Sequence, residues 1–227
     1  MNLTKYKTLI FDCDGVILNS NGVKAEAFYQ AALPYGETVA AAFVNYHVAN
    51  GGVSRYRKFE YLLDTLLTDI DAKKTLRNKS QYNKAKGSLL AHYAAIVALG
   101  LKECDVAEGL HQLRGKTSQT RWLVVSGGDQ DELREIFRER GIEHLFDGGI
   151  FGSPDTKDAI LSRETENKNI GRPALFIGDS QYDYIASRNA GLDFMFLRGW
   201  SEWQPSEEWV QKEGMYTALF LRDLLDE

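Results

Sequence analysis

The chain has 227 residues, 44% hydrophobic and 26% charged, and its 27 basic and 32 acidic residues give a net charge of −5. This composition is typical of a globular protein with one domain or two unequal domains, and it excludes a disordered chain. The mild acidity gives no electrostatic reason to expect a nucleic acid or an anionic membrane as a partner. Because the chain has neither an apolar run of membrane-spanning length nor a signal-peptide core at its start, we expect a cytoplasmic protein.

Five short apolar segments are typical of buried parallel strands, and three of them end abruptly at polar residues. The segments are residues 8–11, 122–125 and 174–177, with weaker candidates at 149–151 and 194–197. Helical patterns follow at residues 131–140, 156–165, 183–189 and 216–225. This alternation predicts an α/β fold with an open parallel sheet, in which ligands bind at the carboxyl ends of the strands.

Residues 21–100 differ from the rest because they contain helical patterns and no convincing strand. The helices are expected at residues 24–32, 37–49, 54–67 and 82–99. A connection between two strands usually takes a handful of residues, so this block is too long to be one. We therefore expect a core made of residues 1–18 and 101–227, with an inserted helical subdomain at residues 19–100.

Two acidic pairs directly follow predicted strands: Asp12 with Asp14, and Asp179 with Asp183. Two carboxylates about 4 Å apart repel by about 4 kcal/mol at an effective dielectric near 20, so each pair needs a cation or a shared proton. Oxygen donors of this kind suit Mg²⁺ rather than zinc. The alternative is that these residues only cap a turn and a helix.

Two further candidates follow other predicted strands. Ser126 and Gly127 precede a helix, where a hydroxyl and free backbone N–H groups can bind an anion. Lys157 lies at another loop-to-helix junction, although a lysine there is commonly a solvated surface residue, and Lys168 is a rival nearby. Together with the acidic pairs, these residues supply a nucleophile, an acid/base, phosphate-binding groups and a metal site. These are the groups that an enzyme of phosphoryl transfer requires.

In these motifs the chain resembles the phosphatase branch of the haloacid dehalogenase (HAD) superfamily. The matching motifs are Asp12-Cys13-Asp14-Gly15-Val16, Ser126, Lys157 and Gly178-Asp179-Ser180-Gln181-Tyr182-Asp183. The resemblance spans nearly the whole chain and implies a Rossmann-like core with an inserted four-helix cap, as in phosphoglycolate phosphatases and β-phosphoglucomutases. One departure is Asp158, which stands after Lys157 where relatives commonly have proline.

The resemblance also implies roles for the motif residues. Asp12 would be the nucleophile that forms an aspartyl-phosphate, and Asp14 would be the general acid and base. Ser126, Gly127 and Lys157 would hold the transferring phosphoryl group. Because dehalogenases of this superfamily lack the second acid, the presence of Asp14 favours cleavage of phosphate esters over cleavage of carbon–halogen bonds.

Mg²⁺ would be held by Asp12, Asp179 and the main-chain carbonyl of Asp14, with Asp183 bound directly or through water. In the cap, Arg55 is expected to reach the substrate, although a solvated basic surface is an equal alternative for it. Replacing Arg55 by Ala should then raise KM for the true substrate and leave a small synthetic ester nearly unaffected.

The expected activity is Mg²⁺-dependent hydrolysis of a small phosphate monoester, such as a sugar phosphate or a phosphoglycolate-like compound. A phosphomutase with the same motifs is the main alternative. A receiver-like signalling protein and a non-catalytic relative that binds a phosphorylated ligand are weaker ones. The sequence leaves open whether the protein is a monomer or a homodimer.

Overall fold

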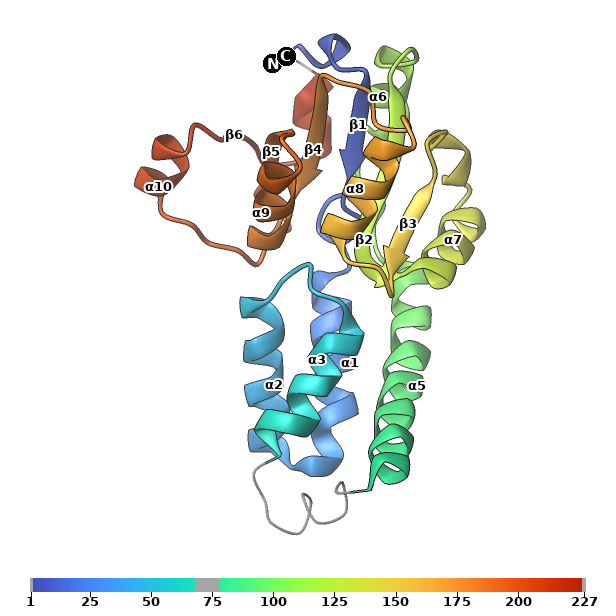
Figure 1. The fold of residues 1–227 in the computed structure, drawn as a ribbon, viewed down its shortest axis with the longest axis vertical. Coiled ribbons are helices and arrows are strands. Elements are labelled where there is room, and N and C mark those ends of the chain that lie inside the picture. Colours follow the sequence, from blue (N-terminus) through green and yellow to red (C-terminus); the bar gives the residue numbers. More distant parts are fainter. Residues whose placement is uncertain (1, 68–77, 226–227) are drawn as a thin grey trace.

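The computed structural model describes residues 2–67 and 78–225. Six strands form one parallel sheet in the order β3-β2-β1-β4-β5-β6, which confirms the predicted α/β fold (Figure 1). The strands are β1 (Thr8–Phe11), β2 (Arg121–Asp129), β3 (Ile150–Ser153), β4 (Ala174–Gly178), β5 (Asp193–Leu197) and β6 (Tyr216–Ala218). The second strand is longer than expected and contains Ser126 instead of ending before it.

Helices cover both faces of the sheet. They are α6 (Leu110–Lys116), α7 (Gln130–Glu139), α8 (Lys157–Glu166) and α9 (Gln181–Asn189). α10 (Glu207–Lys212) lies to one side of the sheet, between β5 and β6, and short 3₁₀ turns occur at Leu3–Lys5, Glu143–Leu145 and Leu221–Leu225. Figure 1 shows α8 and α9 in front of the sheet. Ile10 packs with the apolar side chains of α8 and α9, whereas Leu9 and Phe11 pack with those of α6 and α7. Burial on both faces explains why the strands are continuously apolar.

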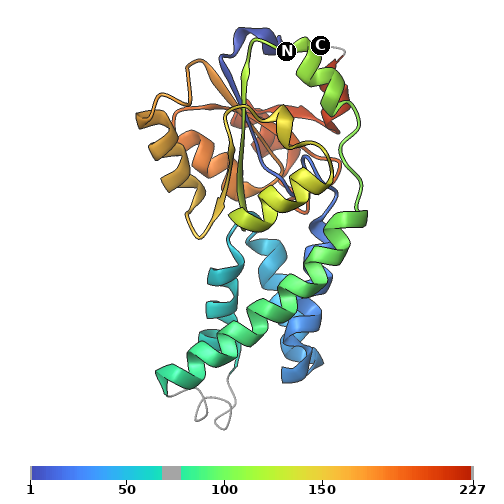
Figure 2. The same cartoon turned by 90° about the vertical axis from the view of Figure 1, so that its right-hand side faces the viewer.

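The described helices between β1 and α6 form a bundle at the carboxyl ends of the strands, whose arrows point toward it in Figure 1. Its helices are α1 (Asn21–Ala32), α2 (Glu37–Ala49), α3 (Arg55–Tyr61) and α5 (Lys79–Glu103), with a 3₁₀ turn at Leu33–Tyr35 and a π-helical turn at Leu62–Leu66. Figure 2 shows α5, in green, running from the far end of the bundle to the core. We call this bundle the cap.

The cap has an apolar core of its own, built around aromatic rings. Phe28 packs against Phe43 and Phe59 with ring centroids 5.2 and 5.4 Å apart, and against Tyr93 at 4.3 Å. These rings come from all four cap helices, so they hold the bundle together. The boundaries of the cap at residues 19 and 100 remain a prediction, and α5 itself continues to Glu103.

The helix predicted at residues 216–225 is wrong. Tyr216–Ala218 instead forms β6, with Tyr216 opposite Met195 of β5, and Leu221–Leu225 forms a 3₁₀ turn. The unpaired edge of β5 offers backbone hydrogen bonds, and tyrosine and threonine are well suited to a strand. A partner that lies far away in the sequence therefore overrides the local helical pattern.

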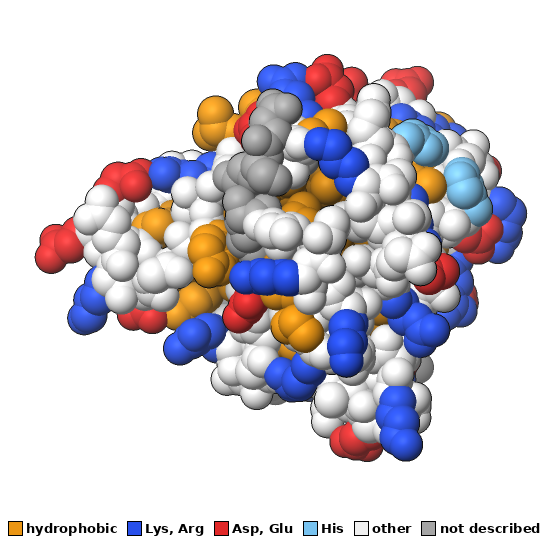
Figure 3. Space-filling view, turned by 90° about the horizontal axis from the view of Figure 1, so that it is seen from above, with side chains coloured by type: hydrophobic (Ala, Val, Ile, Leu, Met, Phe, Trp, Pro, Cys, Tyr) orange, Lys and Arg blue, Asp and Glu red, His pale blue; other side chains and the backbone are white. Residues whose placement is uncertain are grey.

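None of the described helices combines the length and the apolar character needed to cross a bilayer. At the end of the molecule opposite the cap, seen in Figure 3, basic side chains are interspersed with acidic and apolar ones. This mixed face agrees with the small net charge of the chain and gives no sign of an electrostatic binding surface.

Candidate active site

The carboxyl ends of β1 and β4 bring the two predicted acidic pairs together. These strands are neighbours, with Phe11 opposite Ile177, so Asp12 and Asp179 follow adjacent strand ends. The chain leaves β1 for β2 on one side and later returns to β4 on the other, so the strand order reverses here. In open parallel sheets, ligands bind in the crevice at such a point.

Asp12, Asp179 and Asp183 form a buried cluster in which one oxygen of each residue lies within 4.8 Å of the others. Burial raises the pKa of Asp12 to about 7, with Lys157 opposing the shift and Asp183 adding to it. Burial and the charges of Asp183 and Asp12 likewise raise the pKa of Asp179 well above its usual value. The cluster is therefore short of positive charge, and its oxygen-only donors fit a divalent cation such as Mg²⁺.

Lys157, the first residue of α8, faces this acidic cluster. Its Nζ lies 2.8 Å from Asp12 Oδ2 and also donates to Asp183 Oδ1. Burial alone lowers the pKa of Lys157, but the charges of Asp12 and Asp183 outweigh that effect and raise the pKa above its ordinary value. The buried ammonium therefore stays charged, whereas the rival Lys168 is exposed beyond the end of α8.

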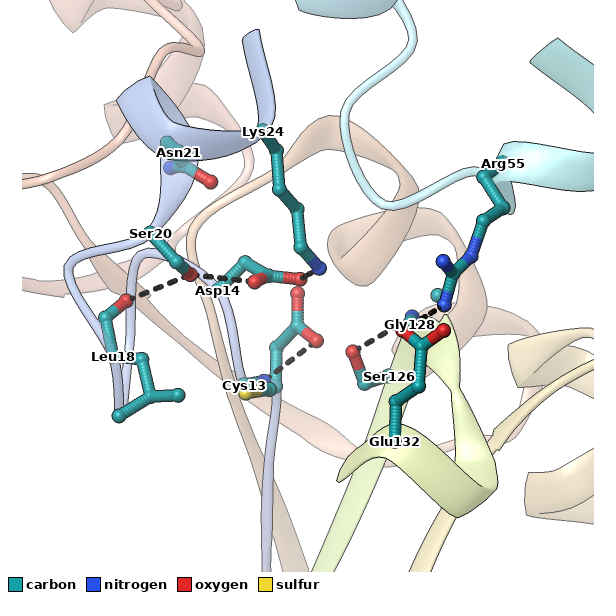
Figure 4. Close-up of polar contacts among 12 residues, drawn as sticks. Cys13, Asp14, Leu18, Ser20, Asn21, Lys24, Arg55, Ser126, Gly128 and Glu132 are labelled. Atoms are coloured by element: carbon teal, nitrogen blue, oxygen red, sulfur yellow. Dashed lines mark hydrogen bonds and ion pairs between the residues drawn. The ribbon is translucent and has the colours of Figure 1, made fainter. Parts of the chain in front are cut away.

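The carboxylate of Asp14 is held by two residues at the start of the cap. Ser20 Oγ donates to Asp14 Oδ1 at 2.5 Å, and Lys24 Nζ forms an ion pair with Asp14 Oδ2 (Figure 4). Burial alone raises the pKa of Asp14, but the charge of Lys24 and the hydrogen bonds from Lys24 and Ser20 more than offset it. The pKa of Asp14 therefore lies below its usual value, and the residue is ionised in this arrangement.

Gly15 allows the first motif to approach the fourth. Its φ is +71°, and a Cβ atom at this position would lie 2.0 Å from Asp179 Oδ2. Asn21 Nδ2 donates to the same oxygen at 2.8 Å. Only glycine combines this backbone conformation with so close a contact, so Gly15 sets the position of the Asp179 carboxylate.

Ser126 and Gly127 lie near the end of β2, beside β1. Ser126 is fully buried, and its Oγ accepts a hydrogen bond from the Gly128 amide at 3.1 Å, so its hydroxyl proton is available to an anion. A Cβ atom at Gly127 would lie 2.2 Å from the carbonyl oxygen of Gly52. The loop before α3 of the cap therefore touches this strand end.

Asp183 also forms the amino end of α9. Ser180 is the observed N-cap, its Oγ donates to Asp183 Oδ2 at 2.7 Å, and the Asp183 amide donates back to Ser180 Oγ at 3.2 Å. With Lys157 on Oδ1, both carboxylate oxygens of Asp183 have a partner within the chain. The capping role and the position in the acidic cluster thus belong to the same side chain.

A cavity of about 480 Å³ lies between the acidic cluster and the cap. Arg55 lines it, as expected, but its guanidinium bonds to Glu132 of α7 (Figure 4). The guanidinium also lies 5.1 Å from the ring centroid of Tyr93. The charge of Arg55 is therefore already balanced, and its contact with substrate remains a prediction.

Sequence reasoning missed several residues that line the same cavity, including Asn21, Lys24, His47 and Lys58. Asn21 and Lys24 lie in the first turn of the helix that follows the first motif, and this proximity was a usable signal. His47 and Lys58 carried no comparable signal, because their side chains face the cavity only through the packing of α2 and α3.

Solved structures share this fold over the whole chain. A predicted phosphoglycolate phosphatase from Haemophilus somnus 129pt is 19% identical, covers 99% of both chains and has a TM-score of 0.71. A protein from Thermotoga maritima named as a beta-phosphoglucomutase is 16% identical over 97% of both chains, with a TM-score of 0.62. A HAD-hydrolase from Bacillus subtilis, named as bound to magnesium, is 18% identical over 98% of this chain and 100% of its own, with a TM-score of 0.62.

Among curated protein sequences, none matches the chain significantly. A family model described as haloacid dehalogenase-like hydrolase matches residues 6–191. This range covers most of the chain and contains every motif residue from Asp12 to Asp183. The resemblance predicted from the motifs is confirmed: the chain belongs to the haloacid dehalogenase-like hydrolases, and it is an enzyme of the hydrolase class.

Proposed function

We propose that this hydrolase cleaves a small phosphate monoester with the help of Mg²⁺. The observation that carries the proposal is that Asp12 and Asp179 of the acidic cluster line one end of a cavity between the core and the cap, with Lys157 bonded to Asp12 behind them. A cavity of about 480 Å³ suits a small molecule rather than a polymer. The phosphatase named among the structural neighbours agrees with this class of substrate.

Asp12 is the nucleophile in the first step. Its Oδ1 accepts a hydrogen bond from the Cys13 amide at 2.7 Å, and its Oδ2 contacts Lys157, which orients the carboxylate. A carboxylate oxygen attacks phosphorus, the ester P–O bond breaks, and its electron pair leaves on the alcohol oxygen. Asp14 gives a proton to that oxygen, so the products are the free alcohol and an aspartyl-phosphate.

Asp14 then acts as the base in the second step. It takes a proton from a water molecule, whose oxygen attacks phosphorus, and inorganic phosphate leaves while the Asp12 carboxylate is restored. The lowered pKa of Asp14 suits this ionised role. To donate a proton in the first step, Asp14 must lose its ion pair with Lys24, which a small movement of α1 would achieve.

Ser126, Gly127 and Lys157 hold the oxygens of the phosphoryl group that do not react. The free hydroxyl proton of Ser126 and the amide of Gly127 are donors, and Lys157 supplies positive charge in a buried setting where it acts strongly. These groups stabilise the charge that develops during transfer and cost little reorganisation, because β2 fixes the backbone of Ser126 and Gly127 and the first turn of α8 fixes that of Lys157.

The metal-binding residues in this proposal are Asp12, Asp179 and the main-chain carbonyl of Asp14. Asp183 contributes through water, because both of its carboxylate oxygens already have partners. Bound there, Mg²⁺ would neutralise the carboxylates and the phosphoryl oxygens. The magnesium named in the Bacillus subtilis neighbour supports this choice of cation.

A phosphomutase is the second candidate, because a neighbour with the same fold is named as a beta-phosphoglucomutase. It would use the same aspartyl-phosphate, with a substrate hydroxyl in place of water as the acceptor. Conversion of β-glucose 1-phosphate to glucose 6-phosphate in the presence of a sugar bisphosphate, at a rate exceeding phosphate release, would identify it.

The test is phosphate release from sugar phosphates, phosphoglycolate and p-nitrophenyl phosphate, with and without Mg²⁺. We expect metal-dependent release that falls about 10⁴-fold or more in Asp12→Asn, since that change removes the nucleophile. Asp147→Asn is the matched control, because Asp147 is exposed and bonds to the amide of Trp122 at the opposite end of β2. Release from Asp12→Asn at near the wild-type rate would exclude the mechanism.

A further inference from the structure

The two walls of the cavity carry opposite charges. The core wall contributes six acidic residues, whereas the described residues of the cap wall contribute three cations and no acid: Lys24, Arg55 and Lys58. Lys24 is paired with Asp14, and Arg55 is paired with Glu132. Lys58, in contrast, makes no ion pair with any residue that the structure describes.

Lys58 is nevertheless almost completely buried, with 2% of its surface exposed. It lies one turn after Arg55 on α3, so both side chains face the same way. Its Nζ lies 2.6 Å from His47 Nδ1, 3.4 Å from the His47 carbonyl oxygen and 5.4 Å from the ring centroid of Phe28. A buried ammonium without a counter-charge is unfavourable, and burial, followed by the charge of Lys24, lowers the pKa of Lys58 to about 7. A negative group bound beside Lys58 would favour its charged form, and the cap wall supplies none from its described residues.

His47 acts as a positioning residue for Lys58. Burial, followed by the charges of Lys58 and Lys24, lowers the pKa of His47 to about 2, so the ring is neutral and its Nδ1 accepts a hydrogen bond from Lys58 Nζ. The other ring nitrogen, Nε2, is buried without a hydrogen-bond partner in residues 2–67 and 78–225. The Phe28 ring packs on the imidazole at 4.5 Å, which further restricts its orientation.

We propose that Lys58 is a specificity-determining residue that binds a carboxylate of the substrate while the acidic cluster and Lys157 bind its phosphate. This inference rests on the proposed function and narrows it to phosphate monoesters of short hydroxy acids. One unpaired monovalent cation matches one monovalent anion, so a carboxylate fits this wall better than a second phosphate. Lys58 then gains the counter-charge it lacks, in a site where such a bond is strong.

Glu202 is the competing partner for Lys58. It lines the core wall, and burial raises its pKa while the charge of Lys58 opposes that shift. If Lys58 served only to tie a more closed cap to Glu202, it would affect every ester to the same extent. A comparison of substrates that differ only in the carboxylate therefore separates the two roles.

The experiment compares two pairs of esters at saturating Mg²⁺: phosphoglycolate with 2-hydroxyethyl phosphate, and 3-phosphoglycerate with glycerol 3-phosphate. Within each pair a carboxylate is replaced by CH₂OH. For at least one pair, we expect the wild type to prefer the carboxylate in kcat/KM by about tenfold or more, as a charge-assisted hydrogen bond provides. If the hydroxyl esters are cleaved equally well, the inference fails and the phosphatase function stands. If no ester, including p-nitrophenyl phosphate, is cleaved, both fail.

Lys58→Met then tests the residue itself. We expect the preference for the carboxylate ester to collapse by about tenfold or more, chiefly through a higher KM. Arg57→Met is the matched control: Arg57 is the adjacent residue on α3, with 73% of its side chain exposed, and should keep the wild-type preference. An equal fall in kcat/KM for both esters, or an unchanged preference, would overturn the assignment. The preference of the wild type remains decisive if Lys58→Met does not fold.

Discussion

The core and the cap each form one wall of the same cavity, but they hold their charged residues in different ways. In the core, Lys157 pairs with both Asp12 and Asp183 next to strand ends that the hydrogen bonds of the sheet hold in place. In the cap, Lys24 and Arg55 lie on helices and find their carboxylate partners only across the junction with the core. Changes in the core should therefore damage turnover of every substrate, whereas changes in the cap should alter proton transfer, closure or substrate choice.

In the core wall, we expect the largest losses of activity and stability when Lys157 is replaced. Lys157→Met leaves Asp12 and Asp183 buried without their cation, so we expect a fall of about 3–5 kcal/mol in the free energy of unfolding. Phosphatase activity should fall by about 10²- to 10³-fold, because a charge on the transferring phosphoryl group is lost. Urea denaturation and kcat/KM for p-nitrophenyl phosphate measure the two effects.

The exposed Lys168 provides the control for that variant. Lys168→Met makes the same change outside the cavity and should leave both measurements unchanged. Since bound Mg²⁺ would supply positive charge to the acidic cluster, as we propose, adding it should restore part of the lost stability of Lys157→Met. Activity within tenfold of the wild type would contradict the assigned role of Lys157.

A change at Gly15 tests whether close packing in the core sets the metal site. In Gly15→Ala the new Cβ collides with Asp179 Oδ2, so this carboxylate must move. We expect the Mg²⁺ concentration for half-maximal activity to rise about tenfold or more, as happens when the support of a metal ligand is disturbed. The measurement is a Mg²⁺ titration of phosphate release.

Gly141→Ala separates that collision from backbone strain. Gly141 has a φ of +68°, close to that of Gly15, and nothing within 4 Å of its Cβ position. We expect this control to lose about 1–2 kcal/mol of stability from the left-handed backbone and to keep its Mg²⁺ dependence. A Mg²⁺ dependence that shifts equally in both variants would show that packing against Asp179 is irrelevant.

Lys24 tests how the cap controls a core residue. The ion pair holds the pKa of Asp14 below its unfolded value, so ionised Asp14 stabilises the fold above that value and loses this contribution as pH falls through the folded pKa. In Lys24→Met burial prevails and the pKa of Asp14 rises. The leaving group of p-nitrophenyl phosphate needs no acid. With this substrate, the acidic limb of the pH profile of kcat should therefore shift to higher pH by about one unit or more.

Lys86→Met is the control for this pH profile. Lys86 pairs with Glu60 at 2.7 Å within the cap and does not line the cavity, so the acidic limb should stay in place. If the acidic limb of the pH profile of kcat is also unchanged in Lys24→Met, Asp14 is not the base.

The smallest effect is expected at Arg55. Its partner Glu132 is more than one third exposed, so the ion pair contributes about 1 kcal/mol or less to cap closure. We expect Arg55→Ala to raise KM about threefold for all esters alike, and Glu132→Gln to reproduce this rise. If KM rises only for the preferred ester and is unaffected for p-nitrophenyl phosphate, the result would instead support the direct contact between Arg55 and the substrate that the sequence predicts.

Local patterns were sufficient to predict the sheet, the insertion and the acidic cluster. The apolar run before Asp12 and the run before Asp179 each identify a buried strand, and parallel strands bring their carboxyl ends to one edge. The helix predicted at residues 216–225 failed because the edge of β5 pairs with Tyr216. That error arose where a contact distant in sequence competed with a local preference.

The sequence by itself determined the family, the α/β fold and the core half of the site, because each motif residue lies within a strand, in the loop after it or in the first turn of the next helix, and the sheet dictates where these segments lie. Only the tertiary structure decided the cap half. Lys24 and Lys58 face the cavity, and Arg55 meets Glu132, because of how α1 and α3 are rotated about their axes and how the bundle approaches the core. Those orientations result from apolar packing among distant residues such as Phe28 and Phe59, which no short stretch of sequence encodes.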